Sequence, residues 1–235
     1  MSIKQKPDAA SNALQSFISN LDIDAVGISS LDKWKGTELE QAVMKLLPQA
    51  RSVVVLAMEI YPEILNLTSS GRTMGAASLN DLLDRDAEFL YGRLTKAAYD
   101  VAKASRNIGL KALPLPATGC PTDARFLKSI FSYKHAGQMA ELGKIGWHSL
   151  LITPRFGPRV RLSCCLTEAV LEPMGKGKIT LECESCGVCI DNCPAGALTK
   201  PQYGKQYAIN KFACSAFRSA SGGCSECMRV CPVGK

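Results

Sequence analysis

The sequence lacks several features that would place it in common classes of protein. No stretch of the 235 residues approaches the roughly 20 consecutive apolar residues that a membrane-spanning helix needs. The N-terminal stretch MSIKQKPDAASNALQ has neither an apolar signal-peptide core nor a twin-arginine pair. We therefore expect a cytoplasmic protein with no membrane partner.

Cofactor and nucleic-acid signatures are also scarce. The dinucleotide motif G-x-G-x-x-G, the Walker A motif and the corrinoid-carrier motif D-x-H-x-x-G are all absent. The chain has only two histidines, His135 and His148. Its formal net charge is +7, but the basic residues are scattered, so the charge does not favour nucleic-acid binding.

Cysteine is the residue that the sequence has in excess. Eight of the 11 cysteines follow residue 182 and fall in C-x-x-C runs. Clustered thiols in a reducing compartment usually bind a metal or take part in redox chemistry. We interpret Cys164 and Cys165, which are consecutive in a predicted strand, as buried structural residues, and Cys120 as an ordinary loop cysteine.

The first cysteine run has the spacing of a bacterial ferredoxin. Cys183, Cys186 and Cys189 are separated by two residues each, and Cys193 follows after three more, directly before Pro194. In two-cluster ferredoxins the fourth cysteine of this run ligates the other cluster. Proline suits the first position of a helix, so the spacing predicts a short helix that begins at Cys193.

The second cysteine run is irregular and completes two [4Fe–4S] clusters. The crossover rule assigns Cys231, which precedes a proline, to the first cluster. The second cluster then lacks one ligand, and Cys214 alone remains within the segment to supply it. Cluster one therefore takes Cys183, Cys186, Cys189 and Cys231, and cluster two takes Cys193, Cys214, Cys224 and Cys227. A Cys₄ zinc module is the alternative, but zinc sites use paired cysteines without this run.

Helices and strands alternate through the first part of the chain. Apolar periodicity predicts helices at 12–23, 36–47, 78–109 and near 134–143, and strands at 24–30, 52–59, 110–116, 148–154 and 159–171. The pattern predicts an α/β (α+β) sandwich around a mixed sheet in residues 1–174. Residues 175–235 are too poor in large apolar side chains for a core of their own, so we expect a second, ferredoxin-like domain that metal holds together.

The segment AELGKIGWHSLLITPRFGPRVRLSCCLTEAVLEP (140–173) resembles the epoxyqueuosine reductase and reductive dehalogenase superfamily. The matching features are the LG-x-IG turn, LLITP-x-FGP, the Leu166–Thr167 pair and the two cysteine runs with an isolated Cys214. IDAVGIS at 23–29 resembles the opening strand of the family. The resemblance implies a nitroreductase-like fold that holds base-off cobalamin (a corrinoid), to which both clusters deliver single electrons.

Departures from the family pattern bear on substrate and partners. The epoxyqueuosine reductases continue into a helical-repeat region that helps to bind tRNA, whereas this sequence stops at Lys235, so we do not expect tRNA binding. Their catalytic aspartate lies in a D-T-x-P segment, and Asp123 is not in register with it. The exported dehalogenases have a tyrosine acid, for which Tyr133 is a positional candidate.

The sequence yields two sets of candidate site residues besides the cysteines. The catalytic candidates are Tyr133, Lys134 and His135. The cofactor-binding candidates are Gly143, Gly146, His148, Arg155, Gly157 and Arg159. The alternative for each is structural: turn glycines, solvated strand arginines, and packed or surface histidines.

Two functions are compatible with these features. The first is a corrinoid-dependent reductase of a small molecule, supplied with electrons by a donor such as ferredoxin or flavodoxin. The second is an electron-transfer or reactivating partner of another corrinoid or flavin protein. FMN in place of the corrinoid, as in an FMN-dependent reductase, is a third possibility.

Overall fold

The computed structural model describes residues 8–68, 77–175 and 179–234. The chain forms two compact units. The sheet unit comprises Met1–Met58, Tyr91–Leu142 and Leu162–Lys176, and the cysteine unit comprises Glu59–Leu90, Gly143–Arg161 and Gly177–Lys235. The predicted division at residue 175 is linear, whereas these units interleave along the sequence.

A four-stranded sheet in the order β1-β2-β8-β3 forms the centre of the sheet unit. The strands are β1 (Ala25–Ser30), β2 (Ser52–Glu59), β8 (Val160–Thr167) and β3 (Ala112–Leu115). β1 pairs antiparallel with β2, and β3 pairs antiparallel with β8. Backbone hydrogen bonds from Arg51 to Thr167 and from Ile60 to Arg159 give β2 and β8 the antiparallel sense as well.

The prediction of a mixed sheet is therefore wrong for these four strands. β3 runs in the same direction as β2, as a helical crossover requires, but the two are not neighbours. β8, which comes later in the sequence, lies between them and is antiparallel to both. Alternation of helices and strands in a sequence does not reveal such an insertion.

The two central strands carry the core. Every residue of β2 except the last is buried, as the continuous apolar run SVVVLAM predicts for a strand covered on both faces. Cys164 and Cys165 on β8 point to opposite faces of the sheet, and both are fully buried. Burial on both faces shows that the sheet is covered from both sides, and that these cysteines are small core side chains.

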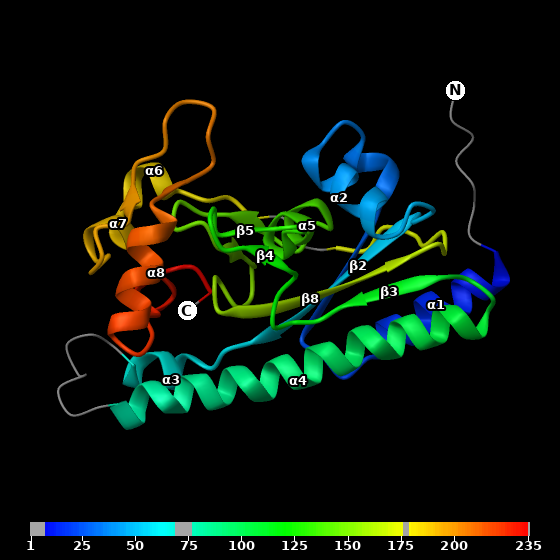
Figure 1. Ribbon diagram of the computed structural model, residues 1–235, viewed down its shortest axis with the longest axis horizontal. Helices are drawn as coiled ribbons and strands as arrows, with labels where there is room; N and C mark the ends of the chain where they lie inside the picture. The colour runs from blue at the N-terminus through cyan, green and yellow to red at the C-terminus, as the bar shows by residue number, and fades with distance from the viewer. Residues whose placement is uncertain (1–7, 69–76, 176–178, 235) are drawn as a thin grey trace. The chain divides into compact units, whose positions relative to one another are not determined.

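Helices cover the sheet of this unit, as Figure 1 shows. The helical elements are α1 (Ala9–Ser19), η1 (Leu31–Trp34), α2 (Glu38–Leu46), α4 (Ala77–Asn107, of which Tyr91 onward belongs to this unit) and α5 (Tyr133–Met139). α4 contacts β8 through hydrogen bonds from Ser163 Oγ to the Leu94 carbonyl and between the hydroxyls of Ser105 and Thr167. A short hairpin, β4 (Thr122–Asp123) with β5 (Lys128–Ser129), precedes α5.

Side-chain caps explain where the shorter helices begin. Asp8 accepts a hydrogen bond from the Ser11 N–H at 2.7 Å, so α1 begins three residues before the predicted position. Thr37 caps the Glu40 N–H at 3.2 Å, and the Glu40 carboxylate accepts the Gly36 N–H, which is a variant of the capping box. The predicted helix at 36–47 is confirmed as α2.

The cysteine unit is built from short elements. They are α3 (Pro62–Leu67), the hairpin β6 (Lys144–Ile145) with β7 (Leu151–Ile152), α6 (Cys183–Cys186), α7 (Val188–Asp191), the hairpin β9 (Leu198–Thr199) with β10 (Ala208–Ile209), α8 (Lys211–Ala220) and α9 (Glu226–Val230). α3 lies against α9, and the Thr68 and Ser225 hydroxyls join these two regions at 2.9 Å.

Two local predictions in this unit are corrected. The strand predicted at 148–154 shortens to β7, because the residues before it form the turn of a hairpin. The helix predicted from Cys193 is instead a tight turn, closed by the Gly196 N–H on the Cys193 carbonyl at 3.0 Å. Gly196 has a φ of 56°, outside the right-handed helical region, so the chain cannot continue as a helix. None of the helices in the described ranges combines the length and apolarity of a membrane span.

Candidate metal centre

A left-handed glycine brings the first three cysteines around one point. Gly187, with φ 59° and ψ −8°, is both the C-cap of α6 and the N-cap of α7. Its N–H donates to the Cys183 carbonyl at 3.2 Å, which ends α6 after a single turn. The αL conformation favours glycine, and it redirects the chain between Cys186 and Cys189.

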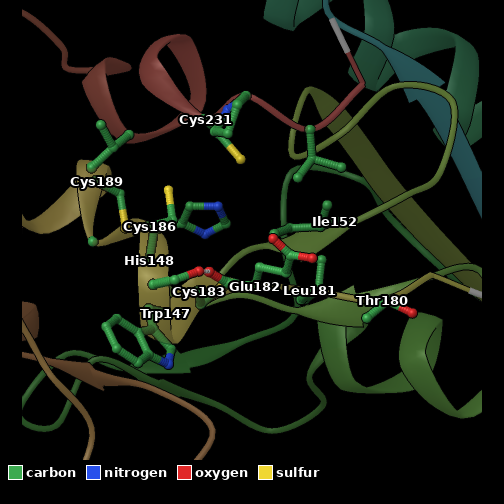
Figure 2. A pocket seen from close by; sticks show the side chains of 15 residues that line it. Trp147, His148, Ile152, Thr180, Leu181, Glu182, Cys183, Cys186, Cys189 and Cys231 are labelled. Carbon is green, nitrogen blue, oxygen red and sulfur yellow. Dashed lines mark hydrogen bonds between the residues drawn. The ribbon is translucent and has the colours of Figure 1, made fainter.

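A pocket of about 240 Å³ opens beside this turn. Figure 2 shows side chains from the cysteine turn, from the C-terminal segment and from the β6–β7 hairpin around it. Its lining includes Cys183, Cys186, Cys189, Cys231, Trp147, His148 and Ile152. Four thiols that are up to 48 positions apart in sequence therefore share one concavity with part of the 140–173 motif.

The charges of three of these thiols act on the fourth. Burial, followed by the neighbouring charges of Cys183, Cys231 and Cys186, raises the pKa of Cys189 to about 11. We call Cys183, Cys186, Cys189 and Cys231 the first thiol group. Repulsion between neighbouring thiolates is lost when a cation, or a cluster of cationic iron, neutralises them.

The second thiol group consists of Cys193, Cys214, Cys224 and Cys227. Burial, followed by the charges of Cys224, Cys214, Cys189 and Cys193, raises the pKa of Cys227 to about 12. The Cys193 charge likewise raises the pKa of Cys214 and of Cys224. The Ala197 N–H donates to the Cys193 sulfur at 3.3 Å, a contact that stabilises a thiolate.

The donor set fits iron–sulfur clusters. Each group consists of four cysteines, the ligand number of a [4Fe–4S] cubane. No three Cys, His, Asp or Glu side chains in the described part of the chain stand close enough to hold a single metal ion. A cubane keeps its four cysteines farther apart than one ion does, because they surround a body of eight atoms.

His148 contributes an imidazole to the first thiol pocket. The side chain is only 3% exposed, and Figure 2 shows its ring facing the space between the sulfurs of Cys186 and Cys231. The Leu150 N–H donates to Nδ1 at 3.1 Å, so the neutral ring carries its proton on Nε2. Gly146 makes room for this ring, because a Cβ there would lie 3.0 Å from Cε1 and 3.3 Å from Nε2.

A backbone clamp holds the segment that carries Cys231. Gly157, at φ 57°, lies so close to this segment that a Cβ would be 2.0 Å from the Val233 carbonyl oxygen. Arg159 is 5% exposed and donates to the Gly234 carbonyl at 2.6 Å, and it pairs with Glu59 at 3.4 Å. The LLITP-x-FGPR stretch thus positions Cys231.

The remaining cofactor-binding candidates have contacts within the same unit. A Cβ on Gly143 would lie 2.0 Å from the Ile152 carbonyl oxygen, so this glycine allows the β6 and β7 backbones to meet. The Arg155 guanidinium stacks on Phe156 at 4.9 Å. Backbone packing accounts for Gly143 and Gly157, and ion pairing for Arg159; a corrinoid-binding role for these candidates stays a prediction.

The catalytic candidates lie in the sheet unit, on the first turn of α5. The Tyr133 hydroxyl donates to the Pro116 carbonyl at 2.7 Å and accepts the Cys120 thiol at 3.4 Å. Burial, followed by the bond from Cys120, holds the pKa of Tyr133 far above its usual value. The His135 Nδ1 is 2.7 Å from the Ser132 hydroxyl. Lys134 is half-buried beside them, and Cys120 is a loop cysteine, as predicted, with a buried side chain.

The sequence reasoning missed the residues that support the Cys231 segment. Glu59 and Gly234 are far from each other in sequence and belong to no motif. Gly234 has a φ of 78°, and its position two residues after Pro232 was a signal of a turn. Glu59 ends an otherwise apolar strand, and a charge in that position was a signal of a buried partner.

Comparisons with known proteins agree with this arrangement. Residues 182–235 match the family model of the 4Fe-4S dicluster domain. A tetrachloroethene reductive dehalogenase of Desulfitobacterium hafniense is 29% identical over 164 residues, which are 62% of this chain and 28% of the dehalogenase. The epoxyqueuosine reductase of Bacillus subtilis is 27% identical over 203 residues, which are 81% of this chain and 49% of the reductase. The chain thus spans half or less of these two curated relatives.

The fold is shared with solved structures. A reductive dehalogenase whose structure is described in terms of B12-dependent dehalogenation superposes with a TM-score of 0.68 at 19% identity. The match covers 99% of this chain and 32% of the dehalogenase. This likeness shows that both units of the chain adopt a known fold. The C-terminal cluster domain is part of it.

Proposed function

We propose that this chain is a two-cluster protein that transfers electrons in a reductive reaction. The proposal rests on its homology to the epoxyqueuosine reductases and the reductive dehalogenases. Its redox role rests on the 4Fe-4S dicluster domain and on reductase homologues. The finer proposal is that single electrons pass through two [4Fe–4S] clusters to a base-off corrinoid, which reduces a small molecule. A nitroreductase-like arrangement of the sheet unit belongs to this proposal.

The observation that carries the proposal is a pocket lined by four thiols, Cys183, Cys186, Cys189 and Cys231. The effect of the Cys193 charge on Cys214 and Cys224 supports the second ligand set that the crossover spacing predicts. We assign one cluster to each group. A bound cluster supplies a one-electron couple whose potential depends on hydrogen bonds to its sulfurs.

The chain's own residues define the surroundings of the first cluster. Trp147 and Ile152 give its pocket an apolar wall. His148 supplies an N–H donor, and the Gly157 and Arg159 clamp fixes the Cys231 segment. Apolar walls and donors together set the free energy of adding a negative charge there.

The corrinoid is the acceptor that homology supports. One solved relative is described in terms of B12-dependent dehalogenation, and the match covers 99% of this chain and 32% of that relative. Gly143, Gly157 and Arg159 do not fit as its cradle, because protein atoms fill the space beside them. If a corrinoid binds, residues other than these three hold it.

Cofactor content of the anaerobically purified protein tests the proposal directly. Two [4Fe–4S] clusters correspond to about eight iron and eight sulfide per chain. Stoichiometric zinc without sulfide would show that the cluster assignment is wrong. Cobalamin titration, followed by the base-off absorbance spectrum, tests the acceptor separately, and flavin is assayed in the same sample.

The packing of the corrinoid candidates favours a second function. An electron-transfer or reactivating partner delivers electrons to a corrinoid or flavin held by another protein, and needs no cradle of its own. This function predicts full clusters, no cobalamin binding, and reduction of an added corrinoid protein. Turnover of a small substrate by the isolated, cobalamin-loaded chain would exclude it.

A further inference from the structure

The cysteine segment carries its charges in two blocks of opposite sign. Residues 179–191, around the first three cysteines, have three carboxylates and no cation: Glu182, Glu184 and Asp191. Residues 192–225, which hold three cysteines of the second thiol group, have four cations and no carboxylate: Lys200, Lys205, Lys211 and Arg218. All of these side chains are exposed, and Lys176 and Lys178 lie outside the described residues.

Two of the cations flank a ligand cysteine on one helix face. Lys211, Cys214 and Arg218 lie on α8 at spacings of three and four residues, which places them on the same side of the helix. The Arg218 charge lowers the pKa of Cys214, as a nearby cation does, against a larger opposing effect of burial. The positive charge is thus adjacent to the second thiol group.

A hairpin precedes this helix, and its loop carries the other two cations. Lys205 lies near the end of the loop, and Lys200 begins it, with Nζ 5.9 Å from the ring of Trp147 in the first thiol pocket. β9 pairs with β10, so the loop 200–207 leaves and returns at one place, and α8 begins two residues after β10. The loop carries Tyr203, which is fully exposed, and α8 carries Phe212, which is 57% exposed. Exposed aromatic side chains within a cationic surface are typical anchors of a protein interface.

We propose that this surface docks an acidic one-electron carrier protein, and that electrons enter the chain at the second thiol group. We call it the basic face, defined by Tyr203, Lys205, Lys211, Phe212 and Arg218. The inference rests on the proposed function, because it requires a cluster on Cys193, Cys214, Cys224 and Cys227.

Charge decides between the two ends of the cysteine segment. A carrier with a negative surface is attracted to the basic face and repelled by the carboxylates of residues 179–191. In the transfer, the carrier loses one electron and the second thiol group's cluster gains it. No bond forms or breaks, and no proton or further reactant is needed.

Charge reversal tests the docking surface. The variant Lys205→Glu/Lys211→Glu changes the basic face by four charge units. The control Lys45→Glu/Lys103→Glu changes exposed lysines of α2 and α4 by the same amount. Both are made in the full chain with reconstituted clusters, and iron and sulfide content is measured first.

Stopped-flow reduction by a chemically reduced acidic ferredoxin gives the readout. Steering by complementary charge raises association rates by about 10 to 1,000-fold, so we expect at least a tenfold slower reduction of the basic-face variant than of the control. Raising the ionic strength from about 0.01 M to 0.15 M shortens the Debye length from about 30 to 8 Å and should reduce the difference. Reduced methyl viologen, a small cation, should reduce the variant at least as fast as the wild type.

Equal ferredoxin rates for the two variants would overturn the docking inference. So would a wild-type rate that is independent of salt. A chain without iron and sulfide would instead contradict the proposed function, so the two failures are distinguishable. A basic-face variant that is slow with both reductants would show a damaged cluster rather than lost docking, and would also contradict the inference.

Discussion

Replacing Gly157 by alanine should release the first cluster while leaving the second in place. A Cβ at this position would lie 2.0 Å from the Val233 carbonyl oxygen and 2.9 Å from its carbon. Both are backbone atoms, so no side-chain rotation relieves the clash. The Val233 segment must move, and Cys231 lies two residues before it in the sequence.

The loss in the free energy of unfolding that Gly157→Ala should cause has two parts. Alanine at the left-handed φ of 57° costs about 1–2 kcal/mol wherever it occurs. Forcing an extra carbon into packed backbone adds about 1–3 kcal/mol. The total of roughly 2–5 kcal/mol is a large share of the stability of a typical domain.

Gly204→Ala is the matched control. Gly204 has a φ of 79°, and a Cβ there meets nothing within 4 Å. The Gly204→Ala variant should lose only the conformational part of the free energy of unfolding, about 1–2 kcal/mol, and should keep both clusters. Iron and sulfide analysis and urea unfolding of the two reconstituted variants provide the measurement. If Gly157→Ala keeps about eight iron per chain and unfolds with Gly204→Ala, the clamp does not position Cys231.

Three further predictions concern other side chains. His148→Leu removes the N–H donor from the first thiol pocket. A potentiometric titration should therefore show a lower reduction potential for one cluster only. An unchanged potential would mean that the N–H does not reach a cluster sulfur. Arg159→Leu removes a buried guanidinium that pairs with Glu59 and donates to the Gly234 carbonyl. It should lower the free energy of unfolding by about 3–5 kcal/mol, with less loss in the double variant Arg159→Leu/Glu59→Leu. Because burial and the Cys120 thiol raise the pKa of Tyr133 in the folded state, its contribution to stability is present below its ordinary pKa of 10.0 and lost as pH rises above it. Tyrosinate absorbance between about pH 9 and 11 should therefore be the same in Tyr133→Phe as in the wild type while the protein stays folded, and a lost titration step would refute the raised pKa.

Local signals in the sequence predicted much of the fold. The apolar run SVVVLAM became the buried strand β2, and the long periodic stretch at 78–109 became α4. These signals depend on neighbours within a few residues, which a single sequence displays. The cysteine spacing is equally local, and the family model of the 4Fe-4S dicluster domain confirms the type of domain that it predicted. The assignment of each cysteine to a cluster stays a prediction.

Long-range contacts were the part that the sequence did not reveal. Gly157 and Arg159 were candidates for cofactor binding because their motif resembles that of a family whose members hold a cofactor. Their actual neighbours are Val233 and Gly234, more than 70 residues later. Periodicity and spacing contain no information about such a pair, and β8 entered the sheet between β2 and β3 for the same reason.

The proposed docking surface and the His148 pocket together predict a direction of electron flow through the cysteine unit. The first thiol group shares its pocket with Trp147 and His148 of the 140–173 motif. The segment of the second thiol group carries the exposed cations Lys205, Lys211 and Arg218, and it has no carboxylate between residues 192 and 225. The proposal therefore has electrons enter at the basic face and leave by the His148 pocket. Removing the imidazole should then alter their exit without changing the rate at which ferredoxin supplies them.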